Sequence, residues 1–198
     1  MKRTLSVVAV VVLIAALSFI YARDIRLGVA HIVERTRAEH GLTPLLWAAA
    51  YGKTTLVESL LANGANANTA NEHGVTPLMW AAYGGHYDCV TALIDHGAVI
   101  NAQNQWGDTA LSIAAAFGHT DCVNSLIAAS ADVNACDHNG RSGLMRAAQR
   151  GKLDCVNILI AHGALLNAKD RQGKTALFYA AAAKHEDIVK ALRASGAL

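Results

Sequence analysis

Proline and charge are both scarce in this sequence of 198 residues. Proline occurs twice, and lysine, arginine, aspartate and glutamate together make up 16% of the chain, against about 25% in an average protein. Long disordered tails combine high net charge with low hydrophobicity, and 53% of these residues are hydrophobic, so such tails are excluded. Alanine occurs 39 times. A chain rich in alanine and poor in proline favours α-helix, and its length suits one ordinary domain.

The sequence also lacks the motifs that carry common enzyme chemistry. It contains no Gly-x-Ser-x-Gly, no His-Glu-x-x-His and no phosphate-binding glycine loop. Its basic residues are not interleaved with aromatic residues in the way that nucleic-acid-binding surfaces require. These absences predict a protein that is not an enzyme, that needs no cofactor or metal, and that has no nucleic-acid partner.

The longest uncharged run lies at the start of the chain. Lys2 and Arg3 precede nineteen residues without a charge, 4–22, which as a helix would span about 28 Å, close to the ~30 Å of a bilayer core. We interpret residues 1–22 as an uncleaved signal-anchor that places residues 4–22 in the membrane. A signal peptide cleaved near Ser18 is the first alternative, because small residues stand at Ala16 and Ser18. A buried core helix is the second.

Residues 23–40 follow with a helical period of apolar side chains at Ile25, Val29, Ile32 and Val33, which predicts an amphipathic linker or capping helix. The basic start of the chain is typical of a single-pass protein whose main domain is exported, here to the periplasm. The positive-inside rule also counts basic residues after the run, so a cytoplasm-facing domain stays open. Those residues are Arg23, Arg26, Arg35 and Arg37.

From Gly41 onward the sequence repeats itself every 33 residues. The segment GLTPLLWAA at 41–49 returns as GVTPLMWAA at 74–82, and then as GDTALSIAA, GRSGLMRAA and GKTALFYAA, which start at Gly107, Gly140 and Gly173. An asparagine closes each of the first four units: Asn68, Asn101, Asn134 and Asn167. The period therefore defines five units, 41–73, 74–106, 107–139, 140–172 and 173–198.

This period, with Thr-Pro-Leu-x-x-Ala-Ala, Gly-His, Val-x-x-Leu and Gly-Ala-x-x-Asn, resembles the ankyrin repeat. The resemblance covers residues 41–198 and implies an all-α solenoid of helix-turn-helix units with hairpin loops, here preceded by an N-terminal hydrophobic helix. The type indicated is a bacterial membrane-anchored or exported ankyrin-repeat protein. The family implies a non-enzymatic scaffold, so we expect a monomer that binds a protein partner.

Three departures from the family pattern concern stability. The histidine that commonly follows Thr-Pro-Leu is absent from every unit, which leaves the hydrogen bonds that it makes between units unaccounted for. Ser130 stands where a glycine ends the second helix, and Ser142-Gly143 replaces Thr-Pro. We therefore expect units three and four to be the least stable part of the stack.

Cysteine follows the repeat rather than a metal-site pattern. Leu56 and Ile188 occupy, in two units, the position that cysteine takes in the other three, so the position belongs to the core. Packed helices lie farther apart than a disulfide permits, and these thiols should stay reduced. They are Cys89, Cys122 and Cys155. Cys136 falls in a loop and is the expected reactive thiol.

In the ankyrin family, the concave surface is lined by the variable residue after Thr-Pro-Leu-x, by residues next to the central glycine, and by the hairpin tips. Packing between units is the alternative role for aromatic residues there. In unit four, Arg146 and Arg150 take the positions of Trp80 and Gly84, which predicts an anchor for a carboxylate. Transferred residue by residue, the pattern predicts aromatic binding residues at Trp47, Tyr51, Trp80, Tyr83, Trp106, Phe117 and Tyr179.

Charge is divided along the repeats. Residues 41–139 carry one basic and eight acidic side chains, and residues 140–198 carry ten basic and four acidic ones, which predicts a dipole along the groove. The leading functional hypothesis is a membrane-tethered scaffold that holds a protein partner in its concave groove. The alternative is a cleaved, soluble, exported protein that acts as an inhibitor or chaperone of a secreted enzyme.

Overall fold

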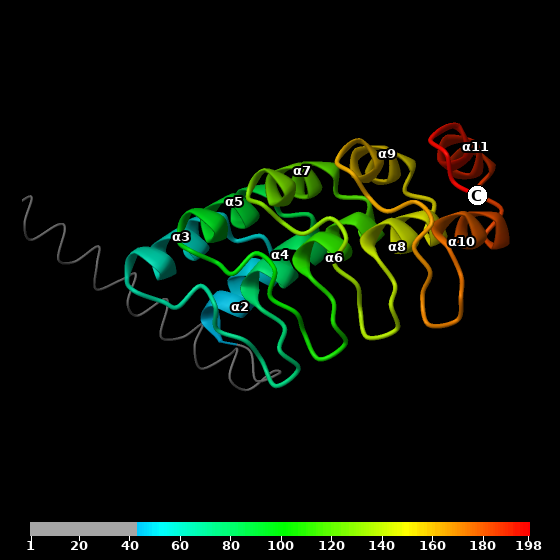
Figure 1. The fold of residues 1–198 in the computed structure, drawn as a ribbon. Helices are drawn as coiled ribbons and strands as arrows, with labels where there is room; N and C mark the ends of the chain where they lie inside the picture. Colours follow the sequence, from blue (N-terminus) through cyan, green and yellow to red (C-terminus); the bar gives the residue numbers. More distant parts are fainter. Residues whose placement is uncertain (1–42) are drawn as a thin grey trace, which may run out of the picture. The chain divides into compact units, whose positions relative to one another are not determined.

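Ten helices, and no strand, make up residues 43–198, the part of the chain that the computed structural model describes (Figure 1). They form five successive pairs: α2 (Pro44–Ala50) with α3 (Thr54–Ala62), α4 (Pro77–Gly84) with α5 (Tyr87–Asp95), α6 (Ala110–Phe117) with α7 (Thr120–Ala128), α8 (Gly143–Gln149) with α9 (Leu153–Ala161), and α10 (Ala176–Ala182) with α11 (Glu186–Ala194). The expected hydrophobic segment over 1–22 and amphipathic helix over 23–40 lie outside the described residues. Within residues 43–198, no helix is long and apolar enough to cross a bilayer.

The helices form two layers. The inner helices α4, α6, α8 and α10 pack side by side, and the outer helices from α3 to α11 follow one another in the second layer (Figure 1). Hairpin loops extend from the inner layer and connect each pair to the next. This arrangement is the all-α solenoid of helix-turn-helix units that the 33-residue period predicts, in which each unit buries its apolar face against its neighbours.

Each inner helix from α4 onward begins at a hydroxyl N-cap. The side chains of Thr76, Thr109, Ser142 and Thr175 each accept a hydrogen bond from the backbone N–H three residues later. Ser142 therefore keeps the cap that Thr provides in the other units, although unit four lacks the Thr-Pro pair. In unit three, Ser112 also accepts from the Thr109 N–H and completes a capping box.

Ser130 adopts the left-handed backbone conformation that glycine has at the equivalent positions. Its φ is +66°, and φ is +77° at Gly97 and +82° at Gly163. A residue with a Cβ is less stable by roughly 1–2 kcal/mol in this conformation. The end of α7 is therefore strained, which is the physical basis for expecting unit three to be less stable than its neighbours.

The cysteine ladder lies in the core between the two layers. Cys89, Cys122 and Cys155 are buried free thiols, and Cys136 is exposed. The burial that the 33-residue spacing predicts for the first three is therefore confirmed. Alanine pairs such as Ala81-Ala82 are also fully buried. Their small side chains allow adjacent inner helices to approach closely.

Histidine and asparagine supply hydrogen bonds between units. His119 Nε2 lies 3.0 Å from the carbonyl oxygen of Tyr83 in the preceding unit, and His86 and His185 make the equivalent bonds. Asn68 donates to the Gly97 carbonyl and accepts from the Val99 N–H, a pattern repeated at the other three closing asparagines. Although every unit lacks the Thr-Pro-Leu histidine, these two repeated positions supply side-chain hydrogen bonds between units.

Candidate functional site

A groove with a volume of about 460 Å³ lies over units two and three. Its walls come from the inner helices, from the ends of those helices, and from the hairpin tips. Val75, Met79 and Ile113 contribute aliphatic side chains to its lining. Six of the nine residues that the sequence predicts for partner binding line this groove: Trp80, Tyr83, Trp106, Phe117, Arg146 and Arg150.

The aromatic rings of the groove pack in series. The ring centroids of Trp80 and Tyr83 lie 6.0 Å apart at an interplanar angle of 84°, and those of Tyr83 and Phe117 lie 4.5 Å apart at 65°. The guanidinium carbon of Arg150 lies 4.4 Å from the centroid of Phe117, within the range of a cation–π interaction. Tyr83 is 49% exposed, so this aromatic wall faces solvent.

Trp106 stands at a hairpin tip that its neighbours hold in place. The ring of Trp106 lies 5.6 Å from that of His73 on the preceding hairpin. The backbone of Gln105 donates to the His73 carbonyl at 2.9 Å, and that of His138 donates to the Trp106 carbonyl at 2.9 Å. Successive tips are thus hydrogen bonded to one another, and the exposed indole is presented from an ordered backbone.

Arg146 belongs to an internal ion-pair network. Its Nη2 donates to Asp137 Oδ2 at 2.8 Å and also to Asp108 Oδ1. The Asp137 side chain is 1% exposed and also accepts from Arg141 Nε at 3.0 Å. The sequence predicts Arg146 as an anchor for a partner's carboxylate. In the structure, two carboxylates of the chain itself already pair with this guanidinium.

Hydrogen bonding controls the ionisation of Asp137. Burial disfavours its charged form, but the backbone N–H of Arg141, the guanidinium of Arg146 and the backbone N–H of Asn139 outweigh that effect. The pKa of Asp137 therefore lies below its ordinary value. Asp137 therefore stays ionised at neutral pH, and together with Asp108 it joins two hairpins to α8 through Arg146.

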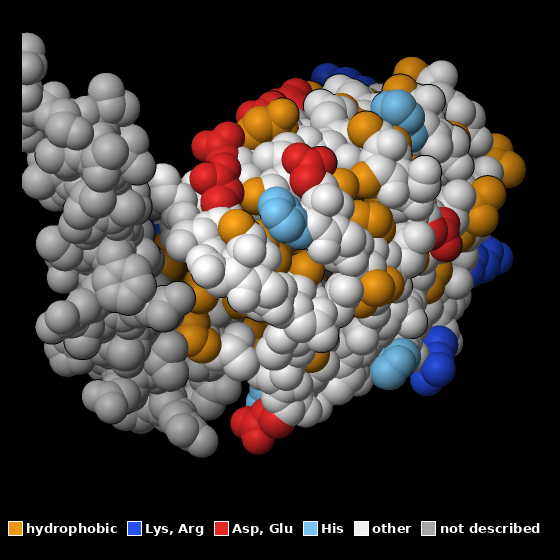
Figure 2. All heavy atoms as spheres, turned by 90° about the vertical axis from the view of Figure 1, so that its left-hand side faces the viewer, with side chains coloured by type: hydrophobic (Ala, Val, Ile, Leu, Met, Phe, Trp, Pro, Cys, Tyr) orange, Lys and Arg blue, Asp and Glu red, His pale blue; other side chains and the backbone are white. Residues whose placement is uncertain are grey.

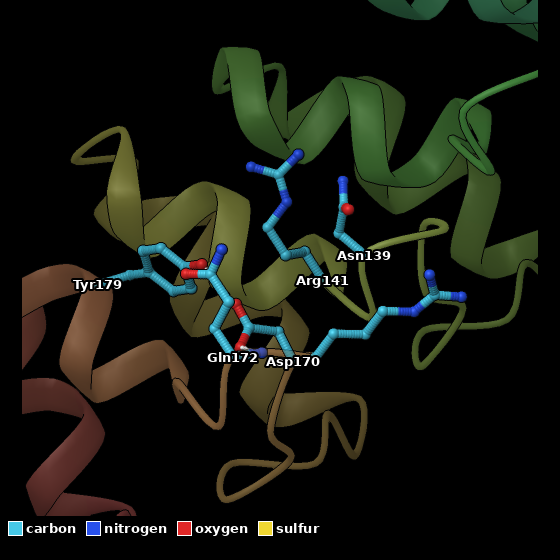
Figure 3. Close-up of a pocket in the computed structure, with 6 residues that line it drawn as sticks. Asn139, Arg141, Asp170, Gln172 and Tyr179 are labelled. Carbon is cyan, nitrogen blue, oxygen red and sulfur yellow. Dashed lines mark hydrogen bonds between the residues drawn. The ribbon is translucent and has the colours of Figure 1, made fainter.

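A smaller polar hollow of about 200 Å³ lies over the hairpins of units four and five (Figure 3). Tyr179 lines it, and its hydroxyl donates to Asp170 Oδ2. That bond lowers the pKa of Asp170 and raises the pKa of Tyr179. Tyr179 is thus separate from the aromatic groove, and its polar end is engaged within the chain.

Trp47 and Tyr51 form a third group, on unit one. Their ring centroids lie 5.0 Å apart, and Tyr51 is exposed. Neither residue lines the groove of units two and three. The structure therefore divides the nine predicted residues among three places rather than along one continuous surface.

The comparison with protein families agrees with this architecture. The family model for ankyrin repeats (3 copies) matches residues 23–104 and 111–197. The chain belongs to the ankyrin-repeat family. Ankyrin repeats are generally modules for protein–protein interaction and are typically non-enzymatic. No curated protein matches the chain. Within residues 43–198, no three histidine, cysteine or carboxylate side chains are grouped so that they could hold a metal ion.

The acidic side chains of the ankyrin units lie mainly away from the groove. Figure 2 shows most of the acidic side chains on that face in its upper half, on the side of the outer helices. Asp108 and Asp137 lie on the hairpin side but are bonded to Arg146. Glu72, however, is exposed beside the groove residue His73 at a hairpin tip, so the acidic end of the groove stays a prediction. The acids on or next to outer helices are Glu58, Asp88, Asp95, Asp121 and Asp132.

Three residues of the site were not predicted from the sequence: Asp108, Asp137 and His73. Asp137 carried a signal that could have identified it, because it stands 33 residues before Asp170 and 33 after Asn104. A polar residue at a fixed position of each ankyrin hairpin indicates a structural role there. Asp108 and His73 carry no such signal, because their contacts depend on how consecutive hairpins are placed in space.

Proposed function

We propose that this ankyrin-repeat chain is a non-catalytic scaffold that binds a protein partner in the groove over units two and three. The observation that carries the proposal is the row of rings formed by Trp80, Tyr83 and Phe117 along the groove, of which Tyr83 is exposed and the other two are half-buried. Exposed aromatic side chains that form one patch are typical of protein-binding sites. Trp106 supports the proposal from the hairpin side, since it is half exposed and borders the same groove.

The competing role for these rings is packing between units. Substitution of Tyr83 distinguishes packing from partner binding. Trp80 is half-buried against the core, so its truncation would alter both packing and binding. Tyr83 projects from the end of α4 and is 49% exposed, and Tyr87, at the start of the outer helix α5, is 46% exposed. Tyr87 is not among the groove residues. It therefore provides a matched control of equal chemistry and exposure.

The test is affinity capture from native membranes with the full chain, followed by measurement of Kd for the captured partner. Tyr83→Ala should weaken binding about 30-fold, which corresponds to the loss of a ~2 kcal/mol hot spot, and Tyr87→Ala should leave Kd unchanged. If Tyr83→Ala and Tyr87→Ala bind like the original chain, the groove is not the binding surface and the proposal fails.

We further propose that residues 4–22 tether the scaffold to a membrane as an uncleaved signal-anchor, with the ankyrin units on the periplasmic side. Two observations support this: the run is uncharged and long enough to span, and the ankyrin match begins directly after it, at residue 23. N-terminal sequencing of the protein from carbonate-washed membranes should begin at Met1. A mature chain that starts after Ser18 would instead favour the exported inhibitor or chaperone. Reporter fusions after Leu198 test on which side of the membrane the ankyrin units lie.

A further inference from the structure

Units four and five carry three cations that have no carboxylate partner in the described part of the chain, one at the end of α8 and two in the hairpin before α10. Arg150 follows α8, and Arg171 and Lys174 stand in the hairpin before α10. Among the ion pairs of residues 43–198, none involves any of these three. Arg150 instead lies over the Phe117 ring, and Lys174 Nζ lies 5.1 Å from the centroid of the Phe178 ring.

The carboxylates on this side are occupied within the chain. Asp137 and Asp170 are buried, and their oxygens accept bonds from backbone N–H groups and from Arg141, Arg146 and Tyr179. The other acids of units four and five lie on outer helices: Asp154 on α9, and Glu186 and Asp187 on α11. Within units four and five, no carboxylate of the inner helices or hairpins is therefore left to neutralise these cations.

The polar hollow adds hydrogen-bond donors to this charge. Asn139, Arg141 and Gln172 line it, as Figure 3 shows, and so does Arg171. The side-chain amides of Asn139 and Gln172 make no hydrogen bond within residues 43–198. Its volume of about 200 Å³ accommodates a carboxylate group. Asp170 also lines the hollow, with its Oδ2 bonded to Tyr179, and Arg141 is paired with Asp137. The hollow thus combines the unpaired cation of Arg171 with two side-chain amides that have no partner in residues 43–198.

We propose that the bound segment of the partner is an extended, acidic peptide. Its apolar side chain enters the groove of units two and three, and its carboxylates lie against Arg150 and Arg171. This inference rests on the proposed function and adds the chemistry of the partner to it. Arg150 connects the two parts, because it borders the aromatic groove and belongs to the unpaired cations.

A protein partner fits this surface better than a nucleic acid. Proteins that bind single strands interleave their cations with rings on which bases stack. The hairpin tips next to these cations carry Asn139 and Gln172, where the tip of unit two carries Trp106. Amide side chains at the tips can hydrogen bond to carboxylates and peptide groups. Charge complementarity between the cations and an acidic partner mainly sets the association rate and the choice of partner.

The experiment selects a displayed library of random peptides on the full chain, immobilised in micelles of a non-ionic detergent. The peptides retained should share an apolar residue together with Asp or Glu. The charge-reversed variant Arg150→Glu with Arg171→Glu should lose the acidic preference, with affinity for a wild-type-selected peptide falling about 10-fold at low salt. Lys190→Glu, on the outer helix α11, is the matched control and should retain both preferences.

The outcomes distinguish failure of this inference from failure of the proposed function on which it rests. Peptides that are apolar but not acidic, and whose retention Tyr83→Ala abolishes, would overturn the inference and leave the groove as the binding site. A library from which nothing is retained would overturn both. Binding of labelled oligothymidylate, or of vesicles containing phosphatidylglycerol, that the charge-reversed variant abolishes would assign the basic side to a nucleic acid or a membrane and also overturn the inference.

Discussion

Arg146 lies nine residues after Asp137, and its Nη2 donates to the Asp137 carboxylate at 2.8 Å. Tyr179 lies nine residues after Asp170 and donates to it in the same way. In the two preceding hairpins the acid is replaced by an amide, and the residue nine positions later is apolar: Asn71 with Trp80, and Asn104 with Ile113. A hairpin acid thus occurs with a donor on the following inner helix. At Asp170 the Tyr179 hydroxyl is the one donor to Oδ2 within residues 43–198, whereas Asp137 Oδ2 accepts from Arg141 as well as from Arg146.

This pairing predicts strong coupling between the two positions in unit four. Arg146→Ile should lower the free energy of unfolding by about 3 kcal/mol, since it leaves buried charge behind. Asp137→Asn should also destabilise. The double variant, which copies the Asn104–Ile113 pair, should cost at least ~1 kcal/mol less than the sum of the single variants. Urea unfolding of the four proteins measures this coupling.

The same pairing can be tested in reverse in unit three. Asn104→Asp places an acid where the residue nine positions later, Ile113, offers no donor, so it should destabilise the chain. Two results together would contradict the pairing. The effects of Arg146→Ile and Asp137→Asn on the free energy of unfolding would be additive, and Asn104→Asp would leave that free energy unchanged.

A second prediction concerns pH and the Tyr179–Asp170 bond. A carboxyl group whose pKa is lowered on folding stabilises the protein above its unfolded pKa, about 3.9, and that stability is lost as the pH falls through the folded value. Tyr179→Phe removes the bond that lowers the pKa of Asp170. It should reduce the free energy of unfolding by about 1–2 kcal/mol at pH 7, and by less at pH 3.

Tyr87→Phe is the control for this experiment, because no hydrogen bond of the Tyr87 hydroxyl is present in residues 43–198. Tyr87→Phe should leave the free energy of unfolding unchanged at both pH 3 and pH 7. A loss in Tyr179→Phe that is equally large at pH 3 and pH 7 would mean that the tyrosine contributes through packing, and that the charge of Asp170 is not involved.

The third prediction uses the strained turn at the end of α7. Ser130→Gly should raise the free energy of unfolding by about 1 kcal/mol and Tm by about 2–4 °C, because glycine adopts a φ of +66° without steric cost. Ser125→Gly, inside α7, provides a contrast and should destabilise by about 0.5–1 kcal/mol. A lower Tm for Ser130→Gly would mean that the serine side chain stabilises the turn by more than the strain costs.

Much of the fold could be predicted from the period, since α4 begins at the Pro that follows Thr76 and α6 at the residue that follows Thr109. The groove could be predicted in part, because the register of the repeat places Trp80 and Tyr83 on one helix face. The pairing of Arg146 with Asp108 could not be predicted. Those residues are 38 positions apart, and only the placement of one hairpin beside the helix of the next unit joins them.

The final prediction concerns the cysteines. Burial raises the pKa of Cys122 and Cys155 to about 11, and Cys89 is equally inaccessible. A thiol reagent at pH 7 should therefore modify one thiol per folded chain, Cys136. Burial and the nearby carboxylates of Asp137 and Asp132 also raise the pKa of that thiol, so its reaction should be slower than that of free cysteine and should accelerate as the pH rises.

Mass spectrometry of the labelled chain identifies the modified residue, and Cys136→Ser should abolish labelling without denaturant. Within the ladder, Cys122→Asp should destabilise by roughly 3–5 kcal/mol, since an unpaired charge would be buried, whereas Cys122→Ala, which keeps the position apolar, should cost about 1 kcal/mol. The ladder is buried in the contact between layers, so its thiols become accessible only when units separate. Rapid labelling of all four thiols in the native protein would show that the units separate readily and would contradict the stacked core.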